Sequence, residues 1–288
     1  MSLVCEHLSY TYSSHEGRIE ALRDISCTVN EGECLAIIGH TGSGKSTLLQ
    51  LMCGLISPTA GRVLLDGEDI TSKSVRRRLH TEVGMAFQYP EYQLFAPTVA
   101  EDVGFAARNA GLPAEEVTRR VRLAMERVRL DYERYASLSP FELSGGEKRR
   151  VALAGVIATE PRILLLDEPA AGLDPAGRRE MDAILKRFTQ SGMGIVMVTH
   201  SMNDVARLAQ RVLVLKDGSE VEQGTPLEIF ARAEDLRAIN LGVPQAEEYA
   251  ATLREAGLPL PAGLLTLESL ADALAALTPV GEGGTHGL

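Results

Sequence analysis

No apolar run in this 288-residue chain approaches the roughly 18 residues that a helix needs to cross a bilayer. The first residues also lack the basic stretch and following apolar stretch of a secretory signal. These absences argue against a membrane-spanning or secreted protein. We expect the chain to work on the cytoplasmic side.

Positive charge and cysteine are scarce as well. The 29 Lys and Arg residues face 39 Asp and Glu residues, and the formal net charge of −10 argues against nucleic acid or anionic lipid as the main ligand. The cysteines are Cys5, Cys27, Cys34 and Cys53. They lack metal-ligand spacing and suit a reducing compartment as small buried residues. The short basic runs 76–78 and 148–150 are expected to be solvated helix faces, although the second could stabilise contacts of its helix.

What the chain does contain is a glycine-rich loop at residues 39–46 that fits the phosphate-loop pattern G-x-x-x-x-G-K-[ST] at every position. The apolar run 34–38 predicts a buried strand before it, and residues 47–52 predict the start of a helix after it. Unpaired N–H groups at that helix N-terminus favour an anion. Lys45 is expected to reach the β- and γ-phosphates, and the Ser46 hydroxyl to bind Mg²⁺. The expected nucleotide-binding residues of this segment are Gly39, His40, Thr41, Gly42, Ser43, Gly44, Lys45, Ser46 and Thr47.

Two further predicted strands end in candidate catalytic groups. The apolar run 163–166 leads into Asp167 and Glu168, at the sheet edge where open α/β folds bind ligands. Asp167 is placed to hold Mg²⁺, directly or through water, and Glu168 to polarise the attacking water. The strand 194–199 should lie beside the phosphate-loop strand and ends at His200, which is expected to face the γ-phosphate and orient the water.

A second glycine-rich segment, Leu-Ser-Gly-Gly-Glu at residues 143–147, precedes the acidic strand. Ser144, Gly145 and Gly146 at a helix N-terminus form a second anion cradle. The same residues also fit an ordinary capping box, with Ser144 as the N-cap and Glu147 at the third helical position. Both interpretations can hold together, because the cap geometry is what exposes the amides. Together with the phosphate loop, this signature segment predicts a nucleotide sandwiched between two ATPase domains.

In combination, these motifs resemble those of the ATP-binding cassette (ABC) ATPases, over about residues 3–230. The resemblance implies that the signature segment acts in trans on the γ-phosphate of ATP held by the partner's phosphate loop. The residues that would do so are Ser144, Gly145, Gly146 and Glu147. It also implies that Gln88, after the apolar run 83–87, contacts Mg²⁺ and water, which makes Ser46, Gln88 and Asp167 the expected metal-binding set.

Three more positions take their expected roles from this resemblance. Asp174, in the Gly-Leu-Asp sequence at 172–174, resembles a residue of the loop that crosses the dimer interface. Tyr12 resembles the aromatic residue that stacks on adenine, with Tyr10 as a nearby alternative. Ala170 departs from the family, where Thr is common, and this change should remove only a hydroxyl.

A finer resemblance, to the ATPases of energy-coupling-factor transporters, rests on residues 39–47, 87–95 and 143–152. Within that family the chain resembles the second of two paired ATPase subunits. The stretch Tyr-Pro-Glu-Tyr-Gln-Leu-Phe at 89–95 is the most diagnostic, and its aromatic side chains favour a protein-binding site for a membrane protein. The resemblance implies ATP and Mg²⁺ as cofactors. It also implies three partners: a second ABC ATPase subunit (a sister chain or a second copy), an integral membrane scaffold protein and a substrate-capturing membrane protein.

The order of these patterns predicts an α/β fold of the P-loop NTPase class, with a RecA-like, mostly parallel sheet, an antiparallel β layer and a helical signature subdomain at about 90–158. The ABC ATPase domain would span 3–230, and a small helical extension with a flexible end would span 231–288. Two helical patterns within 245–278 flank a Pro-rich turn. An apolar stripe, either packed on the core or in contact with the partner ATPase, is formed by Leu264, Leu265, Leu267, Leu270, Leu274 and Leu277. Residues 281–287 are expected to be disordered.

These features predict an ATP-hydrolysing subunit of an importer of vitamins or transition metal ions, in which ATP closes a dimer and hydrolysis opens it. One alternative is an ABC-type ATPase that acts on ribosomes or DNA. Such proteins usually carry tandem cassettes or a long coiled-coil insert, and this chain has neither. The other alternative is a regulatory module that holds ATP without turnover, and the intact Glu168 and His200 argue against it.

Overall fold

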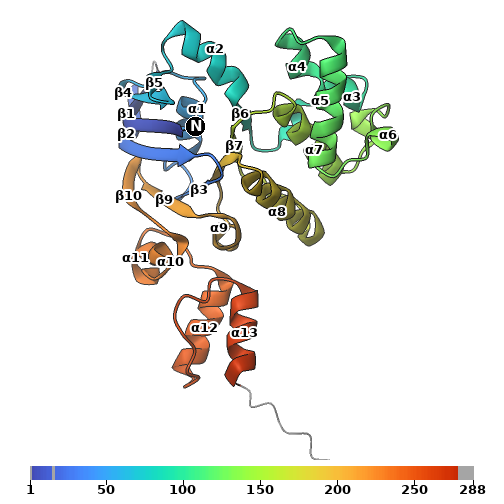
Figure 1. Ribbon diagram of the computed structural model, residues 1–288. Coiled ribbons are helices and arrows are strands. Elements are labelled where there is room, and N and C mark those ends of the chain that lie inside the picture. Colours follow the sequence, from blue (N-terminus) through green and yellow to red (C-terminus); the bar gives the residue numbers. More distant parts are fainter. Residues whose placement is uncertain (1, 15–16, 278–288) are drawn as a thin grey trace, which may run out of the picture.

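The computed structural model describes residues 2–14 and 17–277, which form a ten-stranded sheet surrounded by helices (Figure 1). The strands are β1 (Ser2–Ser14), β2 (Gly17–Asn30), β3 (Cys34–Ile38), β4 (Ala60–Leu65), β5 (Glu68–Asp69), β6 (Val83–Ala86), β7 (Ile163–Asp167), β8 (Gly194–Val198), β9 (Arg211–Lys216) and β10 (Ser219–Gly224). The helices of the first half are α1 (Lys45–Met52), α2 (Lys73–Glu82), α3 (Val99–Val103), α4 (Phe105–Asn109), α5 (Ala114–Arg127) and α6 (Tyr132–Tyr135). Those of the second half are α7 (Gly145–Ile157), α8 (Pro175–Gln190), α9 (Met202–Leu208), α10 (Pro226–Phe230), α11 (Ala233–Ala238), α12 (Gln245–Glu255) and α13 (Leu267–Leu277). Two 3-10 turns are η1 (Pro90–Gln93) and η2 (Pro140–Glu142).

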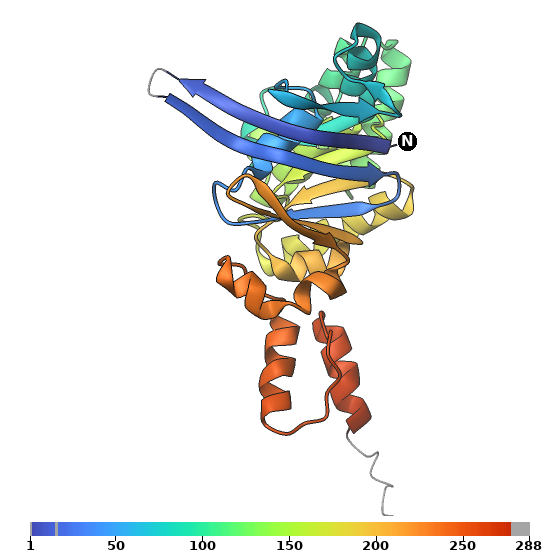
Figure 2. The same ribbon diagram turned by 90° about the vertical axis from the view of Figure 1, so that its left-hand side faces the viewer.

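The sheet has a parallel half and an antiparallel half. The strand order is β5-β4-β1-β2-β10-β9-β3-β8-β7-β6, in which β9, β3, β8, β7 and β6 pair in parallel. The strands β5, β4, β1 and β2 pair antiparallel, and β1 and β2 run together across the molecule as a long ribbon (Figure 2). β10 joins the halves, since it pairs antiparallel with β9 and meets β2 at Ser219 and Arg23. The predicted fold, a mostly parallel core with an antiparallel layer, is confirmed, while β10 was not predicted.

The central strands are buried on both faces, and their side chains alternate between two hydrophobic cores. On β3, Leu35 and Ile37 belong to the core shared with the antiparallel layer and α1, whereas Ala36 and Ile38 belong to the core shared with the helical subdomain. The strands β7 and β8 alternate in the same way. A strand of period two that is covered on both sides therefore reads as an unbroken apolar run in the sequence.

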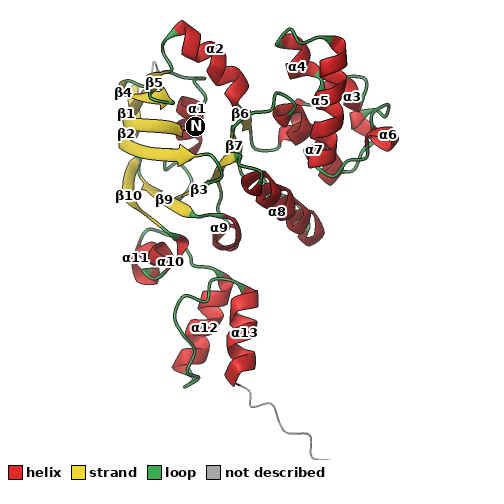
Figure 3. Cartoon of the chain, viewed as in Figure 1, coloured by secondary structure: helices red, strands yellow, loops and turns green. Residues whose placement is uncertain are grey.

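The segment between η1 and α7 is helical and stands to one side of the sheet (Figure 3). Its helices are held by the same core as the parallel strands, since Val103 of α3 and Met125 of α5 cluster with Ala86 of β6 and Leu166 of β7. The subdomain that carries the signature segment is thus packed on the sheet through a shared apolar core. This arrangement agrees with the helical insert that the sequence predicts.

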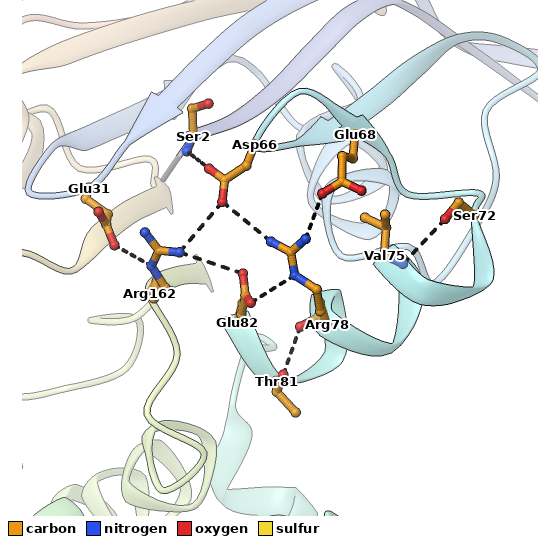
Figure 4. Close-up of polar contacts among 10 residues, drawn as sticks. All are labelled: Ser2, Glu31, Asp66, Glu68, Ser72, Val75, Arg78, Thr81, Glu82 and Arg162. Carbon is orange, nitrogen blue, oxygen red and sulfur yellow. Dashed lines mark hydrogen bonds and ion pairs between the residues drawn. The ribbon is translucent and has the colours of Figure 1, made fainter.

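A network of charged groups lies at the amino ends of β6 and β7 (Figure 4). Arg78 of α2 contacts Glu68 at 2.8 Å and Glu82 at 3.2 Å. Arg162, directly before β7, contacts Glu31 at 2.6 Å, and both arginines approach Asp66 at 3.6 Å. The run 76–78 lies on a solvated helix face, as expected, and Arg78, whose side chain is 40% exposed, also contacts three carboxylates.

The C-terminal extension forms a helical hairpin of α12 and α13 that stands below α10 and α11 in Figure 1. The two predicted helices and the turn between them are confirmed, and they share a small core of their own. The predicted leucine stripe is only partly correct. Leu264 and Leu265 precede α13, Leu270 is buried, and Leu267 and Leu277 are exposed. The expected disordered end, 281–287, lies outside the described residues, and none of the described helices is long and apolar enough to span a membrane.

Candidate functional site

The phosphate loop joins β3 to α1, as the sequence predicts. A Cβ added to Gly39 would lie 2.3 Å from the Leu215 carbonyl oxygen and 2.4 Å from Ser43 Oγ, so the loop needs glycine at this close approach. The Lys45 ammonium folds back into the loop and donates to the carbonyl oxygens of Gly39 at 2.7 Å and His40 at 2.8 Å. Burial lowers the pKa of Lys45, while the charges of Glu168 and Asp167 oppose that shift. An anionic ligand would give this buried cation the counter-charge it lacks in the loop.

A hydroxyl and a carboxylate meet where Mg²⁺ is expected. Ser46 Oγ donates to Asp167 Oδ2 at 2.8 Å, which joins the first turn of α1 to the end of β7. No group of three or more His, Cys, Asp or Glu side chains that could hold a metal occurs among residues 2–14 and 17–277. Mg²⁺ usually takes one or two protein oxygens and completes its shell with water and phosphate oxygens. The Ser46–Asp167 pair fits such an ion.

Glu168 carries the most perturbed carboxyl group of the site. Its Oε1 atom is buried and has no hydrogen-bond partner among the described residues, and His200 Nε2 lies 3.4 Å from it. Burial raises the pKa of Glu168 to about 7, the Asp167 charge adds to the shift, and a backbone hydrogen bond from His200 and the Lys45 charge oppose it. Burial also lowers the pKa of His200, and the Lys45 charge lowers it further. A general base works best when its pKa lies near the working pH, so the environment of Glu168 suits proton transfer from water.

These groups share one cavity of about 700 Å³ at the carboxyl ends of the parallel strands. Its lining includes Lys45, Ser46, Thr47, Gln88, Asp167, Glu168 and His200. The predicted neighbourhood of the phosphate-loop strand and the His200 strand is confirmed, since β3 and β8 pair in parallel. The structure therefore brings together, in one chain, the predicted catalytic and metal-binding side chains that come from four separate segments of the sequence.

Tyr12 lines this cavity and donates or accepts a hydrogen bond with Thr47 Oγ1 at 3.2 Å. Tyr10 instead packs against the core and meets the Tyr12 ring edge-on, with centroids 4.8 Å apart. Of the two predicted candidates for adenine stacking, only Tyr12 presents its ring to the cavity.

Part of the cavity wall was not predicted. It comes from β2, through Ile19, Glu20 and Arg23, and from the β9–β10 turn, through Asp217 and Gly218. These two segments are joined by a hydrogen bond from the Arg23 amide to the Gly218 carbonyl at 2.7 Å. No local motif marks them, because they reach the site only through the pairing of the two halves of the sheet.

The signature segment lies outside this cavity, at the N-terminus of α7. Ser144 caps the helix, because its Oγ accepts from the Glu147 amide at 3.4 Å. In return, the Ser144 amide donates to Glu147 Oε2 at 2.8 Å and the Ser144 hydroxyl donates to the same atom at 2.6 Å. The predicted capping box is confirmed, and the bonds from Ser144 lower the pKa of Glu147 to about 2. No described atom would lie within 4 Å of a Cβ added to Gly145 or Gly146, so the surface beside these glycines is open. The predicted anion cradle is thus accessible, but only from outside this chain's own cavity.

Asp174 caps a different helix. Its Oδ1 accepts from the Gly177 amide at 2.7 Å, at the start of α8. This contact fixes the end of the loop that follows Glu168. The position of Asp174 at a dimer interface stays a prediction.

Comparisons with known proteins agree with this geometry. The sequence model of the ABC transporter family matches residues 22–171. The energy-coupling factor transporter ATP-binding protein EcfA2 of Symbiobacterium thermophilum is 51% identical over 276 residues, which cover 95% of this chain and 96% of that protein. The chain belongs to the ABC transporter family.

Solved structures place the fold in the same family. The structure of cbiO1 from Clostridium perfringens, described as part of the ABC transporter complex cbiONQ, is 39% identical, covers 83% of this chain and 94% of its own, and has a TM-score of 0.71. A dimeric ATP-binding cassette in a post-hydrolysis state, bound to ADP and phosphate, is 29% identical, covers 78% of this chain and 98% of its own, and has a TM-score of 0.69. The predicted P-loop ABC ATPase fold and the ATPase class of this chain are confirmed.

Within this ABC cassette, the basic run 148–150 is the clearest correction to the sequence prediction. Arg149 is buried and paired with Glu91, and Arg150 is paired with Glu180 of α8. The expectation of a solvated helix face is wrong for both, and the alternative, that the run stabilises contacts of its helix, is the correct one. Sequence reasoning missed Arg149 because three consecutive basic residues are usually exposed.

Proposed function

We propose that this chain is the ATP-hydrolysing subunit of an energy-coupling-factor importer that takes up a vitamin or a transition metal ion. The observation that carries the proposal is the buried Glu168 Oε1 atom, which has no hydrogen-bond partner among the described residues and lines the same cavity as the Ser46–Asp167 pair. The 51% identity to an energy-coupling factor transporter ATP-binding protein, over 95% of this chain, supports the assignment to this class of transporter. The ABC ATPase domain would span residues 3–230, and 231–288 would form the helical extension.

In the proposed mechanism, the phosphate loop and Lys45 bind the ATP phosphates. Ser46, Asp167 and Gln88 would hold Mg²⁺, which supplies charge stabilisation to the phosphoryl oxygens when it is bound. Glu168 takes a proton from the attacking water, and His200 orients that water and the γ-phosphate. Tyr12 offers its ring to adenine, on the side of the cavity that faces the antiparallel layer.

The second half of the reaction site would come from another ATPase subunit. Gly145 and Gly146 stand beside open space at the N-terminus of α7, and Ser144, Gly145 and Gly146 do not line this chain's own cavity, as an anion cradle for a partner's ATP requires. We propose a sister ATPase as the partner rather than a second copy, because the energy-coupling-factor resemblance is to one of two paired subunits. Asp174 would lie at that interface.

The proposed contact with the membrane scaffold is the groove between the sheet and the helical subdomain. A cavity of about 320 Å³ there is lined by Pro90, Phe95 and Phe105, among others. Tyr92 and Phe95 are 83% and 58% exposed, which is a large apolar surface for one short segment. Such a groove suits the apolar face of a short helix from a membrane protein. A separate substrate-capturing membrane protein would choose the cargo, and the chain would work at the cytoplasmic face of the membrane.

The proposal is tested by isolating the tagged chain from detergent-solubilised native membranes and assaying what comes with it. We expect a second ATPase and an integral membrane scaffold, together with Mg²⁺-dependent ATP hydrolysis that Lys45→Ala in this chain lowers strongly. Recovery of ribosomes or DNA instead would favour the non-transport alternative. A complete complex that binds ATP without any turnover would favour the regulatory alternative.

A further inference from the structure

One buried guanidinium, that of Arg149 on α7, connects the three segments that carry the nucleotide-facing groups. Its side chain is 3% exposed. It donates two parallel hydrogen bonds to the Glu91 carboxylate of η1, from Nε to Oε2 at 3.0 Å and from Nη2 to Oε1 at 2.7 Å. A bidentate arginine–carboxylate pair of this kind fixes the orientation of the two side chains as well as the distance between them. It ties the signature helix to the turn that begins just after Gln88.

The same guanidinium also reaches the loop that follows the catalytic carboxylate. Its Nη1 atom donates to the carbonyl oxygens of Pro169, at 3.3 Å, and Ala171. The ring of Tyr89 lies beneath it, 5.5 Å from the guanidinium carbon. Arg149 therefore touches the segment after Gln88, the segment after Glu168 and, through its own helix, the signature segment.

This pair is unlike the surface pairs of the same subdomain. Arg122 and Glu133 lie 2.6 Å apart, but their side chains are 52% and 77% exposed, so water screens them. Arg149 and Glu91 are 3% and 15% exposed. Burying two charges costs desolvation that their attraction often only offsets, and a well-packed apolar pair can be as stable. Stability alone is therefore a weak reason for this arrangement, whereas its three-way geometry gives a functional one.

We propose that Arg149 is a positioning residue for ATP hydrolysis, which makes the signature helix, the segment after Gln88 and the loop after Glu168 move as one unit. The inference rests on the proposed function. A change at Gln88 when the γ-phosphate arrives, or leaves, is then passed through Glu91 and Arg149 to the N-terminal turn of α7. Without the guanidinium, ATP still binds the phosphate loop, but the signature end no longer takes its closed position together with Glu168.

The test uses the complex isolated through this chain and compares three changes in it. Arg149→Lys keeps the charge but loses the fork. Arg149→Met with Glu91→Leu replaces the ion pair by an apolar pair and removes the bonds to the Pro169 and Ala171 carbonyls. Arg122→Gln breaks the exposed pair of the same subdomain and is the matched control. ATP turnover, the KM for ATP and the thermal unfolding of each complex are measured together.

We expect the apolar double variant to unfold within a few degrees of the parent, with a KM for ATP within about twofold and a kcat lowered by about 10- to 100-fold. Arg149→Lys should recover part of that loss, and Arg122→Gln should match the parent. A folded double variant with the parent's kcat would overturn the inference, as would a raised KM with unchanged kcat. If the double variant does not assemble, Arg149→Lys decides: parental kcat overturns the inference, and a lowered kcat at parental KM supports it.

The inference and the proposed function fail in different ways. A parent complex without ATP turnover, or one whose turnover survives Lys45→Ala, contradicts the proposed function before Arg149 is considered. A parent complex that hydrolyses ATP, loses it with Lys45→Ala and is indifferent to both Arg149 changes contradicts the inference alone.

Discussion

Charged residues lie at both ends of β7, but those at the amino end are paired with one another, whereas the carboxyl end keeps a carboxyl oxygen without a hydrogen-bond partner in the part of the chain that the structure describes. At the amino end, Arg162 joins Glu31, Asp66 and the neighbouring Arg78 in a network on the surface (Figure 4). At the carboxyl end, after the five residues of the strand, Glu168 is half-buried, and its buried Oε1 atom has no hydrogen-bond partner among the described residues. The hydrogen bond from Arg162 lowers the pKa of Glu31 to about 2, whereas burial raises the pKa of Glu168 to about 7.

The difference shows that the ion pairs at the amino end of β7 contribute to stability, whereas the groups at its carboxyl end are available for binding and catalysis. Charges that have partners within the chain are neutralised there and offer nothing to a ligand. The carboxyl end keeps Lys45 and Glu168 without such mutual neutralisation, although each is partly desolvated. A site that binds Mg²⁺ and phosphate needs charged groups that are not already neutralised by partners within the chain. The sheet places such groups at the edge where its parallel strands end.

The largest expected effect comes from removing the base at the carboxyl end. Glu168→Gln keeps the shape of the side chain but cannot take a proton, so kcat for ATP should fall by about 10²- to 10⁴-fold. ATP binding should persist, and ATP should hold the two ATPase subunits together as a stable closed species in size-exclusion chromatography. Normal turnover in this variant would remove Glu168 from its proposed role.

A smaller effect of the same change appears in the folding equilibrium of the protein without nucleotide or Mg²⁺. Because the folded-state pKa of Glu168 is about 7 and the ordinary value is 4.5, the folded state binds the proton more tightly. The stability from this proton is complete below pH 4.5 and is lost as the pH rises through about 7. Glu168→Gln should therefore raise the unfolding free energy at pH 8 by on the order of 2 kcal/mol and change it little at pH 4.5. A gain of equal size at both pH values, in denaturant titrations, would contradict the buried charge.

The ring of Tyr12 gives the next effect. Tyr12→Leu should raise the KM for ATP by an amount that corresponds to about 1–2 kcal/mol, because one aromatic platform for the base is lost. Tyr12→Phe is the matched control, since it keeps the ring and removes only the hydrogen bond to Thr47. Equal effects of the two changes would mean that the hydroxyl, and not stacking, is what matters.

The smallest effect is expected from a substitution at the amino end of β7. Arg162→Met breaks contacts between side chains that are roughly two-fifths exposed, so it should lower the unfolding free energy by at most about 1 kcal/mol and leave kcat unchanged. The Glu31 pKa of about 2 means that the contribution of this contact is present above pH 4.5 and fades as the pH falls toward 2. Chemical denaturation at two salt concentrations checks both points. A fall in kcat without a fall in stability would contradict the separation of the two ends.

The groups at the carboxyl end of β7 are well predicted from the sequence, and those at its amino end are poorly predicted. Residues 39–46 and the strand that leads into Asp167 are local patterns whose spacing is fixed by the phosphates and by burial on both faces of the sheet. Arg23 and Asp217 reach the same cavity only because β2 and the β9–β10 turn meet across the sheet, and no local pattern records that meeting.

Charge runs and apolar stripes were the weaker guides. The run 148–150 has the composition of an exposed face, yet Arg149 is buried because Glu91, more than fifty residues away in sequence, supplies its counter-charge. Leu267 fits an apolar stripe, yet it is exposed, because α13 begins there and packs on α12 through Leu270. In both cases a distant partner, which single-sequence periodicity does not contain, decides the outcome.

The central claim is that Lys45 and Glu168, at the carboxyl ends of the parallel strands, belong to one half of an ATP site, and that a second cassette supplies the other half. The most direct measurement is a structure of the isolated complex carrying Glu168→Gln, with ATP and Mg²⁺ bound. We predict ATP between Lys45 of this chain and the signature segment of the second ATPase, with Mg²⁺ at Ser46 and Asp167 and with Ser144 of this chain on the partner's nucleotide. ATP bound to this chain alone, with no second cassette over its γ-phosphate, would contradict the account.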